Sequence, residues 1–369
     1  MEETKFDTLK IGGAEVVVGS NVFEAIPDKI SAVSKEGAIC IVYDKKLKDI
    51  AIAVGDSLHK LKRRIFLCEL DKTKPQTDAV PDYIRYIIAV GCGFAAMRAD
   101  KIARAISVPW SMVLTAPTTD TILQGKSPKH VFIDKNMMIN CEKRFVAAGL
   151  GALFARRITA FESEFARVVL SSGDGAKLID VKGEIDACSL AVALLELSTQ
   201  KQFMSSAECA AHIMRAKAVE KKVAPLLVGE YEFILASYIL KLYSFLLSSP
   251  SIDVCLPPTR EEDFDTLSKI GCDYLVKQSK SIDFFETNSY FRISYILSEY
   301  RTDLLDKLRL VESKTAQRIW RRVYDDAGYF LKQAARIGDV EDAVLLAGSV
   351  NENLLGFAYA QGALRACTR

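Results

Sequence analysis

A glycine turn is the feature of this sequence with the clearest potential for ligand chemistry. Gly91 and Gly93 enclose Cys92 directly after the mostly apolar run 83–90, and a helical pattern then continues to residue 105. Glycine tolerates positive φ angles and lets a ligand approach the backbone closely. The N-terminus of a helix adds N–H groups and a partial positive charge, which together favour a phosphate. The alternative is a tight strand-to-helix turn that binds no ligand.

Carboxylates and hydroxyls follow two further apolar runs. Asp44 ends the run 37–44 and precedes two lysines. Its carboxylate either accepts hydrogen bonds from hydroxyl groups of a ligand or belongs to a solvated turn. Thr115, Thr118 and Thr119 stand in the segment T-A-P-T-T-D, where hydroxyls either line a ligand or satisfy the backbone of the turn. Asp120 ends that segment, where an acidic side chain can cap a helix.

The elements that must position these residues change in character near residue 143. Before it, short β-type runs alternate with helical or turn segments, which predicts an α/β domain with a mainly parallel sheet. After it, apolar residues recur at helical spacing with few strand signals. We therefore predict a nucleotide-type domain at 1–150 and a helical domain at 151–369. Strands are expected at 14–20, 37–44, 63–70, 83–90 and 130–134, a further strand and loop at 110–120, and helices at 22–33, 145–157, 186–199, 206–222, 231–247 and 314–337.

Bulk composition excludes several classes of partner. Forty-nine basic and 47 acidic residues leave a net charge of +2, which gives no electrostatic case for nucleic acid or a membrane as the main partner. Nine scattered cysteines without a C-x-x-C pair are typical of reduced thiols. The charged N-terminus shows no signal peptide, and the longest uncharged stretch, 105–119, is too short to span a bilayer. We expect a cytoplasmic protein.

Four segments in order resemble the superfamily of glycerol dehydrogenases, glycerol-1-phosphate dehydrogenases, iron-type alcohol dehydrogenases and dehydroquinate synthases. Those relatives run strand–GGG–helix, then P-T-x-x-S-T-D, then a strand ending in Asp, then A-A-G-x-G-D. Here the segments are AVGCGFAAMRADK (89–101), TAPTTD (115–120), VFID (131–134) and VAAGLGA (146–152). The resemblance covers about the first 160 residues. It implies an N-terminal Rossmann-like parallel-sheet domain and an all-helical C-terminal domain.

The resemblance also implies a nicotinamide nucleotide, NAD or NADP, and a pocket for a small polyol or a phosphorylated polyol. The pyrophosphate would lie on the glycine turn, and the carboxylate after the second strand would accept the adenosine ribose hydroxyls. The threonines would line the nucleotide, and the acid after them would face the substrate pocket. The implied site residues are Asp44, Gly91, Cys92, Gly93, Thr115, Thr118, Thr119 and Asp120.

The metal ligands of the superfamily are missing from this chain. Relatives bind zinc or iron through one Asp and two His, and the Asp ends A-A-G-x-G-D, where this chain has Ala152. The chain has three histidines, and none follows His212. Met97 and Asp100 also replace the Asp and Lys of the helix after the glycine turn. We therefore expect no zinc or iron.

Three functions remain open. The first is a divergent NAD(P)-binding protein whose polyol dehydrogenase chemistry is lost or altered. The second is a dehydroquinate-synthase-like cyclase, which also needs the missing metal and therefore ranks lower. The third is a non-enzymatic scaffold or regulatory subunit that keeps the fold. The apolar C-terminal stretch 350–365 is suited to packing against a partner, and we expect a homo-oligomer.

Overall fold

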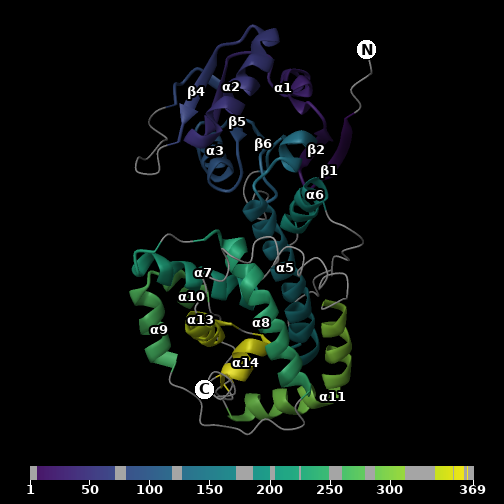
Figure 1. The fold of residues 1–369 in the computed structure, drawn as a ribbon, viewed down its shortest axis with the longest axis vertical. Helices are drawn as coiled ribbons and strands as arrows, with labels where there is room; N and C mark the ends of the chain where they lie inside the picture. Colours follow the sequence, from purple (N-terminus) through teal and green to yellow (C-terminus); the bar gives the residue numbers. More distant parts are fainter. Residues whose placement is uncertain are drawn as a thin grey trace. The chain divides into compact units, whose positions relative to one another are not determined.

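The chain folds into two compact units. The computed structural model describes residues 6–70, 80–118, 127–171, 186–199, 204–223, 226–248, 260–278, 287–311, 337–351, 353–360 and 364 (Figure 1). The first unit comprises Met1–Gly149 and Ile185–Lys201, and the second comprises Leu150–Glu184 and Gln202–Arg369. We expected 151–369 to stay together, but the structure returns 185–201 to the first unit, because helix α6 packs its apolar side on the sheet core there.

The first unit is built on a seven-stranded sheet in the order β1-β2-β7-β6-β5-β3-β4. All neighbouring strands are parallel except β1 and β2, so the predicted mainly parallel sheet is confirmed. Strand β1 was not predicted, although the Gly12-Gly13 pair that joins it to β2 is a hairpin signal. The strands are β1 (Asp7–Ile11), β2 (Ala14–Gly19), β3 (Ala38–Tyr43), β4 (Ile65–Glu69), β5 (Ile84–Val90), β6 (Trp110–Leu114) and β7 (His130–Asp134).

Helices cover both faces of this sheet, which explains why its central strands are apolar throughout. On β3, Cys40 and Val42 belong to the core under α3 and α6, whereas Ile39 and Ile41 belong to the core under α1 and α2. The two side-chain sets alternate because successive residues of a strand point to opposite faces. The helices of this unit are η1 (Val22–Ala25), α1 (Ile26–Val33), η2 (Lys45–Leu47), α2 (Lys48–Ser57), η3 (Leu58–Leu61), α3 (Phe94–Ala105), α4 (Lys135–Ile139) and α6 (Ala187–Ser198).

The described part of the second unit is helical, as predicted. Helix α8 is long and apolar enough by composition to cross a membrane, but 61% of the relevant window is buried inside the protein, against α7 and α11 among others. The helix expected at 314–337 lies almost wholly outside the described residues. The helices are α5 (Lys143–Val169), which begins in the first unit, α7 (Ser206–Glu220), α8 (Val228–Ser248), α9 (Arg260–Lys269), α10 (Asp273–Gln278), α11 (Thr287–Val311), α13 (Ile337–Val350) and α14 (Leu354–Ala360).

Two of the segments that carried the resemblance have structural explanations. The Asp134 carboxylate, at the end of V-F-I-D, accepts the backbone N–H groups of Asn136 and Met137 and so caps α4. In V-A-A-G-L-G-A, a Cβ on Gly149 would lie 1.9 Å from the carbonyl oxygen of Pro117. A Cβ on Gly151 would likewise lie 1.8 Å from the carbonyl oxygen of Gly229, at the start of α8. Both glycines therefore permit close backbone packing on α5.

A buried polar cluster joins the helices of the second unit. Glu162 on α5 accepts a hydrogen bond from the Tyr243 hydroxyl on α8 at 2.5 Å and from the Ser206 N–H on α7 at 3.1 Å. The Asn353 side chain donates to the Ser206 hydroxyl at 2.9 Å, and its carbonyl oxygen accepts the N–H of Leu355 at the start of α14. Burial raises the pKa of Glu162 to about 7, although the hydrogen bonds from Tyr243 and Ser206 oppose this rise.

We expect Gly149→Ala to lower the thermal midpoint of the first unit. A methyl group cannot stay 1.9 Å from a carbonyl oxygen, so either α5 or the loop at Pro117 must move, at a cost of about 1–3 kcal/mol. Gly55→Ala in α2 is the matched control, because its new Cβ meets atoms no closer than 3.7 Å. That change should be neutral or stabilise by up to about 1 kcal/mol. Equal midpoints for Gly149→Ala and wild type would contradict the close contact.

We expect Glu162 to make the second unit less stable as the pH rises from 5 to 8. Its folded-state pKa of about 7 lies above the ordinary value of 4.5, so the folded state holds the proton more tightly. The resulting stabilisation is complete below the unfolded value and is lost as the pH rises through the folded one. The difference corresponds to on the order of 3 kcal/mol.

Thermal unfolding of Glu162→Gln at several pH values tests this expectation, because the variant should lose part of the decline between pH 5 and 8. Glu164→Gln on the same helix is the control. Arg167 and Lys307 lower the pKa of Glu164 to about 2, which lies outside the pH window, so this variant should keep the wild-type slope. A wild-type slope in Glu162→Gln would show that Glu162 does not titrate in this range.

Candidate functional site

The predicted site residues gather where the central strands end. Tyr43 of β3 pairs with Val90 of β5, and Val90 pairs with Val113 of β6. Asp44 and Gly91 therefore begin their loops side by side, and Thr115 follows the adjacent strand. This carboxyl edge is where open α/β sheets bind their ligands. The structure thus brings together residues that are far apart in the sequence.

The two glycines of the turn have positive φ angles but different surroundings. Gly91 has φ +134°, and a Cβ there would lie 3.1 Å from side-chain atoms of both Ala95 and Leu47. Gly93 has φ +47° and precedes α3, with no atom within 4 Å of a Cβ placed on it. Gly91 is therefore required by the local packing, whereas Gly93 borders open space at the N-terminus of a twelve-residue helix.

A side-chain contact that was not predicted joins the glycine turn to the loop after β6, which carries Thr115 and Thr118. The Thr118 hydroxyl donates to the Cys92 sulfur at 3.0 Å, and both residues are half-buried. The Thr118 N–H donates to the carbonyl oxygen of Ala116 at 2.9 Å. The hydroxyl is therefore engaged within the protein, and the predicted role of Thr118 along a nucleotide stays a prediction. Its partner, Cys92, is the residue that stands where the superfamily has its middle glycine.

The carboxylate of Asp44 is also engaged by the protein. Its Oδ1 accepts the backbone N–H of Lys46 at 3.2 Å and so caps the short helix η2. Asp44 is half-buried at the expected edge, and its predicted role toward a ribose stays a prediction. Thr115 is half-buried after β6. Thr119 and Asp120 lie outside the described residues, so their predicted roles stay predictions.

The position of the superfamily's metal-binding Asp is occupied by a buried methyl group. Ala152 lies on α5 and is 5% exposed. In the described ranges, no group of three or more His, Cys, Asp or Glu side chains is placed to hold a metal ion. Glu230, at the start of α8, accepts the N–H of Leu227 at 2.7 Å. The expected absence of zinc and iron stays a prediction.

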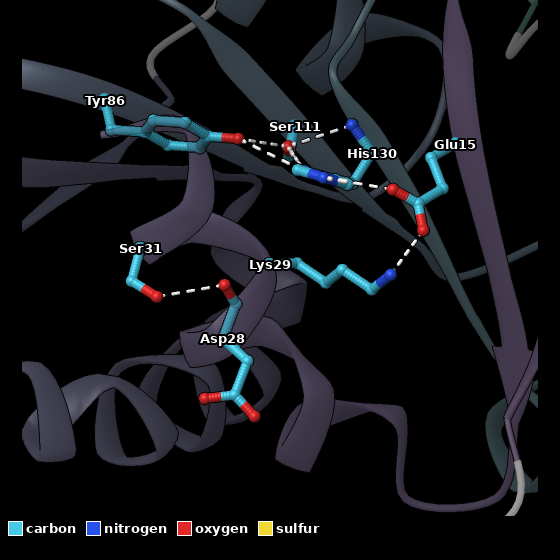
Figure 2. A network of polar contacts seen from close by, with 7 residues as sticks. All are labelled: Glu15, Asp28, Lys29, Ser31, Tyr86, Ser111 and His130. Atoms are coloured by element: carbon cyan, nitrogen blue, oxygen red, sulfur yellow. Dashed lines mark hydrogen bonds and ion pairs between the residues drawn. The ribbon is translucent and has the colours of Figure 1, made fainter. Parts of the chain in front are cut away.

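A second polar cluster lies at the opposite, amino-terminal edge of the sheet (Figure 2). The Tyr86 hydroxyl lies 2.6 Å from the Ser111 hydroxyl, which lies 3.2 Å from Nδ1 of His130. Nε2 of His130 lies 3.6 Å from the carboxylate of Glu15, which also pairs with Lys29 on α1. These side chains come from β5, β6, β7, β2 and α1, on the face of the sheet that α1 and α2 cover.

The order Ser–His–Glu is also that of a hydrolase triad, but access argues against catalysis. Ser111 is 0% exposed and His130 is 4% exposed, so no substrate reaches the hydroxyl. The Ser111 oxygen also accepts the backbone N–H of His130 at 3.1 Å. Burial lowers the pKa of His130, although Glu15 opposes this. A neutral imidazole that accepts at Nδ1 and donates from Nε2 satisfies both neighbours, and the cluster ties four strands to α1.

Comparison with known proteins supports the fold. No family model and no curated protein sequence matches the chain. A maleylacetate reductase from Agrobacterium tumefaciens aligns at 12% identity over 94% of this chain and 92% of its own, with a TM-score of 0.51. A second, from Rhizobium sp. strain MTP-10005, aligns at 11% identity over 100% and 97%, with a TM-score of 0.50. A glycerol dehydrogenase from Schizosaccharomyces pombe aligns at 13% identity over 89% and 94%, with a TM-score of 0.47.

At these identities the likeness concerns the fold and not the activity. The parallel sheet with its helical second unit agrees with the architecture that the four sequence segments implied. The chain therefore has the same two-domain fold as the two maleylacetate reductases.

Proposed function

We propose that this chain binds a nicotinamide nucleotide, NAD or NADP, on the turn Gly91–Gly93. The observation that carries the proposal is the open space beside Gly93, at the N-terminus of α3 and at the carboxyl edge of a parallel sheet. A pyrophosphate placed there would meet backbone N–H groups and the positive end of the helix dipole. Asp44 lies on the adjacent strand end, at the position expected for the adenosine ribose.

We further propose that the metal-dependent dehydrogenase chemistry of the superfamily is lost or altered here. In that chemistry a divalent cation polarises the substrate oxygen while hydride moves between the substrate carbon and the nicotinamide. The methyl group of Ala152 cannot coordinate a cation, and the sequence has no histidine after His212. If the chain retains activity, it acts as an NAD(P)-dependent oxidoreductase on an alcohol, a small polyol or a phosphorylated polyol. Cyclase chemistry ranks lower because it needs the same metal.

A scaffold or regulatory role is the second candidate, and one observation favours it. Two polar groups of the expected nucleotide site already serve the protein, since Asp44 caps η2 and Thr118 bonds to Cys92. Polar groups engaged in this way offer less to a ligand unless they exchange partners. A chain that keeps the fold for an interface would show this pattern without any bound nucleotide.

We expect NAD or NADP to bind wild-type protein and Gly93→Asp to weaken that binding about tenfold or more. The new side chain would put bulk and negative charge where the phosphates approach, so steric exclusion and Coulomb repulsion act together. Calorimetric titration of both proteins with both nucleotides measures the change. Gly271→Asp is the matched control, because Gly271 also has a positive φ and open space but lies in the second unit.

Each outcome of the titration decides one point. If wild type binds neither nucleotide at millimolar concentration, the nucleotide proposal fails and the scaffold role replaces it. If wild type binds but Gly93→Asp binds equally well, the phosphates do not lie on this turn. If Gly271→Asp weakens binding as much as Gly93→Asp, the loss reflects a general effect on the fold.

We expect protein purified without chelator to carry far less than one zinc or iron ion per chain. Elemental analysis by mass spectrometry measures this directly. Ala152→Asp alone should not create a tight site, because a single carboxylate leaves the ion coordinated mostly by water. About one firmly held transition metal per wild-type chain would refute the expectation and restore metal-dependent chemistry as the leading hypothesis.

A further inference from the structure

Strand β4 forms the edge of the sheet opposite the β1–β2 hairpin (Figure 1). Among the strands that the structure describes, it pairs with β3 alone. The Leu70 N–H donates to the Tyr43 carbonyl oxygen on β3 at 2.8 Å, so the even-numbered residues along β4 direct their backbone groups inward. Because these groups alternate in direction along a strand, those of Ile65, Leu67 and Glu69 point away from the sheet. Such groups are a template for a further strand.

The side chains of β4 do not protect this edge in the way that those of β1 protect the other. Four of the five residues of β1 are exposed, and they include an acid and a base. Strand β4 instead reads I-F-L-C-E, with Leu67 40% exposed and Ile65 and Phe66 half-buried. Its one charged residue, Glu69, stands at the end of the strand. An apolar edge strand with so little charge favours pairing with another chain.

The charges at the two ends of β4 suit a second copy of the same strand that runs antiparallel. Arg63 and Arg64 precede the strand, and the exposed Glu69 ends it. The Arg63 guanidinium donates to the carbonyl oxygens of Gly37 and Glu36 at 2.6 and 2.7 Å, which fixes a positive charge at the start. In an antiparallel pair each basic start lies beside the acidic end of the other strand. A parallel copy aligned in register would bring like charges together, which destabilises a strand pair.

We propose that β4 pairs with β4 of a second copy of this chain, antiparallel across a two-fold axis at Phe66. In this register Ile65 lies opposite Leu67 of the second copy, and the outward backbone groups of both residues form the ladder. Arg63 lies opposite Glu69 of the second copy on the same face. On the other face the two copies of Phe66 meet, as a pair without backbone hydrogen bonds, in which side chains approach most closely. The symmetry repeats every contact, and the two sheets become one.

A charge placed near the axis tests the surface. Sedimentation equilibrium of the full chain over a concentration series should show a reversible dimer. Leu67→Lys should raise the dissociation constant of this dimer about tenfold or more, because a charged side chain on an edge strand opposes pairing. Leu9→Lys on β1 is the matched control, since Leu9 is 42% exposed against 40% for Leu67, and it should dimerise like wild type. Thermal unfolding of both variants checks that each is folded.

A cross-link tests the register. Arg64 lies opposite Cys68 of the second copy in the proposed pair, and residues paired in this way have Cα atoms about 4.5 Å apart, within reach of a disulfide. Mild oxidation of Arg64→Cys should therefore yield a covalent dimer in which residue 64 of one chain is linked to residue 68 of the other. Wild type treated in the same way should not be linked at these positions. A dimer of Arg64→Cys without this link would overturn the proposed pairing.

Hydrogen exchange of wild type locates the surface without any substitution. Peptides that cover β4 should exchange more slowly in concentrated than in dilute protein, whereas peptides that cover β1 should exchange equally in both. The proposal is overturned if wild type stays monomeric at hundreds of micromolar or if the protection appears only in another segment. It is also overturned if Leu67→Lys dimerises as tightly as wild type, or if Leu9→Lys weakens the dimer as much as Leu67→Lys.

Discussion

The register among β3, β5 and β6 decides where the candidate residues of the first unit lie. These parallel strands pair up to their carboxyl ends, so the residues that follow them meet at one edge. Tyr43, Val90 and Val113 fix this alignment. A one-residue slip of β5 would turn its apolar side chains to the opposite face and move Gly91 away from Asp44. Burial of both faces therefore holds the glycine turn in place, and the chemistry of the turn depends on the core beneath it.

Close backbone contacts make the second contribution to the position of the site. Gly149 lets the loop at Pro117 rest against α5, and the same loop carries Thr118 to Cys92. The loop at Pro117, the glycine turn and the start of α5 are thus connected within the first unit. The A-A-G-x-G segment keeps this packing function here, although its metal-binding Asp is replaced by Ala152. The motif in this chain thus keeps its closely packed glycines but not the metal-binding Asp.

How far the sequence predicts this structure depends on the range of the interactions involved. The glycine turn and the strands were predictable because glycine conformation and alternating apolar runs are local signals. The return of α6 to the first unit was not, because it depends on which surface its apolar side meets. The cap made by Asp44, the bond from Thr118 to Cys92 and the cluster around His130 also escaped prediction. Each depends on the geometry of a side chain with several chemically reasonable partners.

The hairpin at the start of the chain has a consequence for solubility. Strand β2 carries the run Val16–Val18, and β1 covers the backbone edge that β2 would otherwise present to other chains. Strand β1 is itself mostly exposed and carries Asp7 and Lys10. Charged side chains on a short outer strand discourage the addition of a further strand from another molecule. Strand β1 thus protects this edge of the sheet against edge-to-edge aggregation, and a truncation that removed it would expose the valine-rich edge strand β2.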